Sequence, residues 1–81
     1  MKNNNIRCNL ESLLKILDAR AYIAVYVKDC EENNVAAYDR VKEDRVYTFL
    51  ADPAFLKKYE NYIVVGIVST LTGANILIEE A

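Results

Sequence analysis

Three tyrosines and three basic residues are the side chains of this sequence best suited to binding chemistry, because their spacing places them on one face of a predicted hairpin. They are Tyr22, Tyr26 and Lys28 on "YIAVYVK" and Tyr38, Arg40 and Lys42 on "VAAYDRVK". Successive residues of a strand point to opposite faces, so each set alternates with an apolar set. Tyr and Arg are enriched at the centres of protein interfaces, and a contact with a protein partner is the first expectation.

Two other interpretations of these six residues stay open. Cross-strand pairs of Tyr with Tyr or Arg stabilise an exposed sheet by ~0.2–1 kcal/mol each, without any partner. A sheet with aromatic and basic side chains also stacks bases and meets phosphates, as RNA-recognition sheets do. No stretch matches the string of Gly and aromatic residues that marks such a sheet, and nucleic acid is the less favoured partner.

Catalysis and metal binding find little support in the residue types. The chain has no histidine, the commonest general base and metal ligand. Cys8 and Cys30 are the only cysteines, and their spacing fits neither a metal site nor a redox pair. The acidic segment "DCEENN" lacks the spacing and the glycine of a calcium loop, which favours a solvated turn. We therefore expect a non-enzymatic protein with no cofactor, no metal and two free thiols.

Composition and charge limit the class of protein. The 81 residues are 53% hydrophobic and 27% charged, which is typical of one globular domain. A net charge of −2 argues against broad affinity for DNA or RNA, and it is too small for a DNA mimic. No stretch reaches the ~20 apolar residues of a membrane helix. The start, "MKNNNIRCNL", has no apolar signal region, and the expected location is the cytoplasm of a bacterial host cell.

The elements that must position the tyrosines follow from periodicity and capping residues. Leucines from Leu10 to Leu17 recur with helical spacing, and Asn9 is a suitable cap. After the hairpin, "RVYTFL" favours a short helical stretch, and Asp52 followed by Pro53 starts a second helix that runs to about Glu60. The segments "YIVVGIVS" and "NILIEE" predict two further strands joined by a turn.

The predicted fold class is α+β: a single four-stranded antiparallel sheet with two helices on one face, in the order α-β-β-α-β-β. Residues 1–9 are expected to be a flexible polar N-terminus and residues 10–81 a single domain. The predicted core comprises Leu13, Leu17, Ile23, Val25, Ile63, Val65, Ile67 and Ile78. The third strand is then expected to add Tyr62, Val64, Gly66 and Val68 to the uncovered face. The helix–strand–strand order occurs twice, which indicates either a duplication or similar physics in both halves.

The segments "LLKILDARAYIAVYVKD", "RVYTFLADPAFLKKYENYIVVGIVS" and "NILIEE" resemble small uncharacterised proteins of Firmicutes phages and integrative elements. The likeness covers Leu10 to Glu80 and consists mainly of hydrophobic pattern. It implies an accessory protein of a mobile element, and many such proteins bind and block host defence machines such as CRISPR nucleases. It implies no activity and no site residues.

Three functional hypotheses follow. The first is a non-enzymatic protein-binding module of phage or mobile-element origin that inhibits a host protein, such as a defence nuclease. The second is a nucleic-acid or nucleotide binder that uses the tyrosine-bearing face of the sheet. The third is a structural, self-associating small protein, which includes a homodimer.

Overall fold

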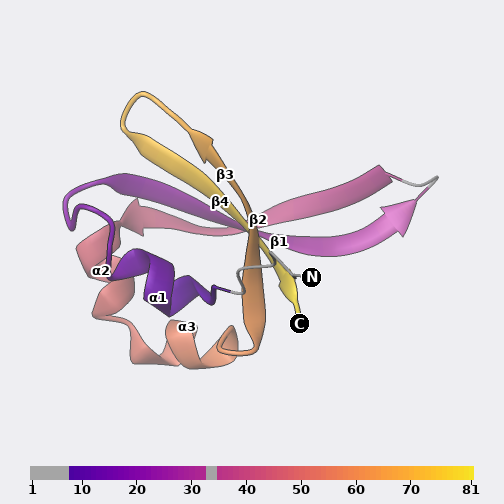
Figure 1. The fold of residues 1–81 in the computed structure, drawn as a ribbon, viewed down its shortest axis with the longest axis horizontal. Coiled ribbons are helices and arrows are strands. Elements are labelled where there is room, and N and C mark those ends of the chain that lie inside the picture. Colours follow the sequence, from indigo (N-terminus) through magenta and orange to yellow (C-terminus); the bar gives the residue numbers. More distant parts are fainter. Residues whose placement is uncertain (1–7, 33–34) are drawn as a thin grey trace, which may run out of the picture.

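A four-stranded sheet carries three short helices on one of its faces (Figure 1). The computed structural model describes the backbone of residues 8–32 and 35–81 and the side chains of residues 8–28 and 37–81. The strands are β1 (Tyr22–Glu32), β2 (Val35–Arg45), β3 (Tyr62–Ser69) and β4 (Gly73–Glu80). The helices are α1 (Leu10–Leu14), α2 (Val46–Leu50) and α3 (Pro53–Lys58). The predicted α+β class is confirmed.

The strand order β2-β1-β4-β3 makes the sheet mixed, so the predicted all-antiparallel arrangement is wrong. The hairpins β1–β2 and β3–β4 are antiparallel, but the central strands β1 and β4 run parallel, from Tyr22 opposite Gly73 to Val27 opposite Ile78. With these two hairpins, an antiparallel sheet would have needed β3 beside β1 or β4 beside β2. The buried side chains explain the difference, because β4 contributes the fully buried Ile76 and Ile78 and takes the centre.

The start of the parallel pair depends on a glycine. The backbone N–H of Tyr22 donates a 3.1 Å hydrogen bond to the carbonyl of Thr72. A Cβ atom on Gly73 would lie 1.8 Å from the carbonyl oxygen of Tyr22. No side chain fits between backbones this close, so glycine is required at this position.

Capping residues set the helix boundaries. The Oδ1 atom of Asn9 accepts a 2.8 Å hydrogen bond from the N–H of Ser12, which caps α1 as predicted. Asp52 caps α3 by accepting from the N–H of Phe55 at 3.2 Å, and Pro53 follows at the first helical position. This break at Asp52 separates α2 from α3, and the sheet therefore carries three helices rather than two.

The core forms where all three helices meet the side of the sheet that bears Ile23 and Ile78. Phe49 of α2 lies at its centre and is fully buried. The buried residues of this core are Leu10, Leu13, Leu14, Ile23, Val25, Val46, Phe49, Tyr59, Ile76 and Ile78. The predicted core residues Leu13, Ile23, Val25 and Ile78 are thereby confirmed.

The predicted core assignment of the third strand is wrong. Val65 and Ile67 are 42% and 53% exposed, and Ile63 is only half-buried, whereas Tyr62 and Val64 pack against the core. Nearly every residue of this strand is apolar, so alternation could not indicate which face is buried. Leu17 is also only half-buried, because α1 ends at Leu14.

Two residues of the predicted flexible N-terminus belong to the folded domain. The carbonyl of Cys8 accepts a 2.8 Å hydrogen bond from the N–H of Val64, and Asn9 forms an antiparallel bridge with Ile63. Cys8 is a free thiol, while residues 1–7 and the side chain of Cys30 lie outside the described part. Among the described residues, no helix is long and apolar enough to cross a membrane.

Candidate interaction surface

The side of the sheet that the helices leave uncovered is the strongest candidate for a functional surface. The helices pack on the side of Ile23, Val25, Ile76 and Ile78, so the residues that alternate with these point the other way. We call this side the open face. Its side chains are Tyr22, Ala24, Tyr26, Lys28, Tyr38, Arg40, Glu43, Arg45, Ile63, Val68, Asn75, Leu77 and Glu79.

The strand register brings most of the predicted binding residues together on the open face. Tyr26 lies opposite Arg40, and Lys28 lies opposite Tyr38. Residues directly opposite in an antiparallel pair share a face and lie within side-chain contact distance. Tyr22, two positions before Ala24 on the same face, is 37% exposed. All three predicted tyrosines therefore lie on the open face.

Lys42 does not belong to this surface, which corrects the sequence-based prediction. The β1–β2 register shifts between Tyr26, opposite Arg40, and Val25, opposite Lys42, so Val41 is an extra residue in β2. Such a bulge inverts the alternation of the strand beyond it. Lys42 therefore points to the helix side, where its Nζ lies 2.7 Å from Asp52 Oδ2.

The same bulge adds two charged residues that the sequence prediction missed. Glu43 and Arg45 now face the open side, and the ion pair between Arg40 and Glu43 measures 3.2 Å. Arg45 lies opposite Tyr22, with its guanidinium carbon 6.0 Å from the centre of the tyrosine ring. No residue of "VAAYDRVKEDR" is a recognisable bulge signal, so the sequence could not place Arg45 here.

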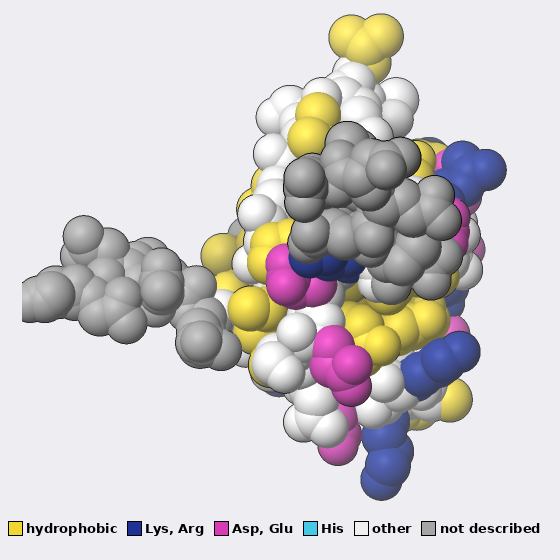
Figure 2. All heavy atoms as spheres, turned by 90° about the vertical axis from the view of Figure 1, so that its right-hand side faces the viewer, with side chains coloured by type: hydrophobic (Ala, Val, Ile, Leu, Met, Phe, Trp, Pro, Cys, Tyr) yellow, Lys and Arg dark blue, Asp and Glu magenta, His cyan; other side chains and the backbone are white. Residues whose placement is uncertain are grey.

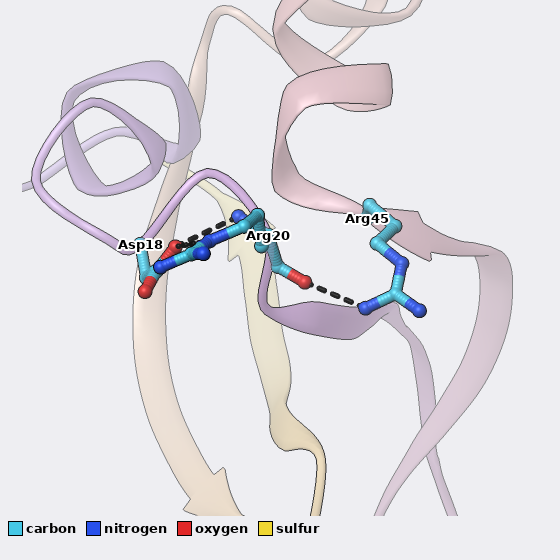
Figure 3. A network of polar contacts seen from close by, with 3 residues as sticks. All are labelled: Asp18, Arg20 and Arg45. Carbon is cyan, nitrogen blue, oxygen red and sulfur yellow. Dashed lines mark hydrogen bonds and ion pairs between the residues drawn. The ribbon is translucent and has the colours of Figure 1, made fainter.

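A small polar network fixes one end of the open face (Figure 3). Arg45 Nη1 donates a 2.7 Å hydrogen bond to the carbonyl of Arg20. The carboxylate of Asp18 accepts from the backbone N–H of Arg20 at 2.9 Å and lies 3.5 Å from its Nε atom. These bonds, first the backbone N–H and then the guanidinium, lower the pKa of Asp18. The network holds Arg45 beside Tyr22.

Tyr62 and Val64 lie on the helix side, although the sequence placed them on the open face. The ring of Tyr62 packs edge-on against Tyr59 at 5.0 Å between centres, and Tyr59 packs at 5.0 Å against Phe55. The β3 register shifts between Val64, opposite Ile78, and Gly66, opposite Leu77. Gly66 and Val68 therefore do lie on the open face, because the alternation inverts at Val65.

A shallow groove of about 460 Å³ lies on the helix side of the sheet, between the β1–β2 hairpin and the C-terminal end of α3. It is lined by Val27, Lys28, Asp39, Val41, Lys58, Tyr59, Tyr62 and Glu80. Figure 2 views the molecule from this end and shows hydrophobic side chains between acidic and basic ones. This mixed lining carries no arrangement suited to a particular reaction.

Within residues 8–28 and 37–81, no three His, Cys, Asp or Glu side chains are grouped so as to hold a metal ion. The acidic side chains of the predicted turn "DCEENN" lie outside the described part. Comparisons of the chain with protein-family models, curated proteins and solved structures found no match.

Proposed function

We propose that the protein is a non-enzymatic protein-binding module that contacts its partner through the open face. The observation that carries this proposal is the arrangement of three tyrosines and two arginines on a sheet face that no helix covers. Tyr26 lies opposite Arg40, and Tyr22 lies opposite Arg45. Tyr and Arg side chains contribute much of the binding energy at protein interfaces, because they combine apolar area with hydrogen-bonding groups.

The charges of the open face support a protein partner over a nucleic acid. Basic Lys28, Arg40 and Arg45 are mixed there with acidic Glu43 and Glu79, and Arg40 forms a 3.2 Å ion pair with Glu43. A surface that binds the phosphate backbone needs an excess of positive charge, whereas a mixed surface suits the polar rim of a protein interface. The net charge of −2 points in the same direction.

The nature of the partner rests on the resemblance to proteins of mobile elements. It implies that the partner is a protein of a bacterial host, such as a defence nuclease, which the module would inhibit by covering a surface of it. To be complementary to the open face, the partner's surface would have to combine apolar area with both acidic and basic groups.

The test compares tyrosines on the two sides of the sheet. Tyr26→Ala removes a ring from the open face, and Tyr47→Ala removes a ring that is 55% exposed on α2, on the helix side. The tagged wild-type protein captures partners from a bacterial lysate, and the captured protein is then titrated against the wild type and each variant by calorimetry. We expect Tyr26→Ala to weaken binding by about 30-fold, as at an interface hot spot, and Tyr47→Ala to bind like the wild type.

Two controls make the result interpretable. Thermal melts of both variants must show folded protein, and titration with fluorescent single-stranded RNA at low salt tests the nucleic-acid hypothesis. Unchanged affinity in Tyr22→Ala, Tyr26→Ala and Tyr38→Ala would contradict the proposal. These tyrosines would then be sheet stabilisers only.

A further inference from the structure

Within the described residues, the outer edge of β3 is unpaired over half of its length. At the start of the strand, Cys8 and Asn9 pair with Val64 and Ile63. From Val65 to Ser69, no residue in the described part of the chain pairs with the outer side of β3, which is an edge strand of the sheet. An unpaired edge presents backbone N–H and C=O groups that can accept another strand.

The valines and the isoleucine along this edge are exposed, and they lie on both faces of the sheet. Val65 is 42% exposed, and Ile67 and Val68 are each 53% exposed. Ile67 lies opposite Ile76 and therefore on the helix side, whereas Val68 lies opposite Asn75 on the open face. The sequence from Tyr62 to Ile78 contains no charged residue. We call Val65–Ser69 the bare edge.

The opposite edge of the same sheet is protected in the usual way. Its strand, β2, carries the charged residues Asp39, Arg40, Lys42, Glu43, Asp44 and Arg45. Charged side chains on an edge strand oppose the addition of another strand, because pairing would desolvate them. One edge of the sheet is thus guarded and the other is not, which is the pattern expected where only one edge has a partner.

We propose that the bare edge pairs antiparallel with the bare edge of a second copy of this chain, about a twofold axis. Two identical strands related in this way are self-complementary, since each residue contact occurs twice. The bare edge carries no charge, so the pairing brings no like charges together despite the net charge of −2. A foreign strand would find no charged group along this edge to select it.

The side chains also fit a pairing centred on Ile67. Antiparallel symmetry then places Gly66 opposite Val68 of the second copy, and Val65 opposite Ser69 of the second copy. A small residue thus meets a larger one at each flanking position. The pairing would bury apolar side chains on both faces and join two four-stranded sheets into one continuous sheet.

The experiment is sedimentation-velocity ultracentrifugation of the full chain over a wide concentration range. Val65→Lys places a charge in the bare edge, and Val41→Lys places the same charge on the guarded edge. The two valines are matched, since both lie at register shifts and are 42% and 41% exposed. We expect a wild-type dimer, at least about tenfold weaker self-association for Val65→Lys, and no weakening for Val41→Lys.

Circular dichroism of each variant establishes that it is folded, and Val68→Lys serves as a second variant of the bare edge. A wild-type chain that stays monomeric at every concentration overturns the proposal. So does a dimer that persists unchanged in both Val65→Lys and Val68→Lys. Val65→Lys changes no side chain assigned to the open face, whereas Val68 lies on that face, so a loss of self-association in Val65→Lys separates the inference from the proposed function.

Discussion

The Nζ atom of Lys42 lies 2.7 Å from the Oδ2 atom of Asp52, which joins strand β2 to the first turn of α3 on the helix side of the sheet. The ammonium group also lies 4.9 Å and 5.1 Å from the ring centres of Phe49 and Phe55. Asp52 caps α3 through its other oxygen, which accepts from the N–H of Phe55. One carboxylate thus fixes both the helix start and the lysine.

This contact predicts a pH dependence of stability. Hydrogen bonding from Lys42, and next the backbone N–H of Phe55, lower the pKa of Asp52 below its usual 3.8. A folded-state pKa below the unfolded one stabilises the fold above the unfolded pKa, and this contribution is lost as the pH falls through the folded pKa. Urea unfolding at a series of pH values should therefore show a smaller loss of stability on acidification in Asp52→Asn than in the wild type. Parallel curves for the two proteins would contradict it.

A matched pair of leucines tests the extent of α1. Leu14 is fully buried at the end of the helix, while Leu17 is half-buried beyond it. Leu14→Ala should lower the free energy of unfolding by ~2–5 kcal/mol, because it leaves a cavity in the core. Leu17→Ala should cost less than about 2 kcal/mol, since solvent already reaches this side chain. Urea denaturation measures both, and equal losses would mean that Leu17 is part of the core.

A matched pair of glycines tests the central strand pairing. A Cβ atom at Gly73 would collide with the backbone of Tyr22, whereas one at Gly66 would lie 3.1 Å from Cδ1 of Leu77, a side chain that can move. Gly73→Ala should therefore cost at least about 2 kcal/mol, and Gly66→Ala less than about 1 kcal/mol. Thermal and urea unfolding compare the two. A Gly73→Ala protein as stable as the wild type would show that β1 and β4 do not approach this closely.

Local signals in the sequence were sufficient to predict the helices and strands and to assign the two faces of β1. The alternation of Tyr22, Ile23, Ala24 and Val25 assigned both faces of β1 correctly, because only one set was a good core set. Asn9 and Asp52 marked helix starts, since their short polar side chains satisfy free N–H groups at those positions. These features depend on residues close together in the chain.

The errors came from features that depend on distant contacts. The bulges at Val41 and Val65 each inverted the alternation of a strand, and this misplaced Lys42, Tyr62 and Val64. The Val41 bulge has no glycine or proline beside it, so the sequence carried no sign of it, whereas Gly66 directly follows Val65 and is the kind of strand glycine that often marks a bulge. The parallel pairing of β1 with β4 was missed because it depends on which strand buries more apolar surface. The two halves also occupy non-equivalent places, with β1 in the centre and β3 at an edge.

The central parallel pair has a consequence for the order of folding. It pairs the strand that begins at Tyr22 with the strand that begins at Gly73. These strands are far apart in the sequence, so the two central strands can pair only after most of the chain has become ordered. The β1–β2 hairpin has contacts between near neighbours and a smaller entropic cost of closure, so we expect it to form first. Stopped-flow experiments on Ile76→Val should then show faster unfolding with little change in the folding rate. Until β4 docks, the hairpin would lack a partner on the side of β1, and this brief interval is when aggregation would compete with folding.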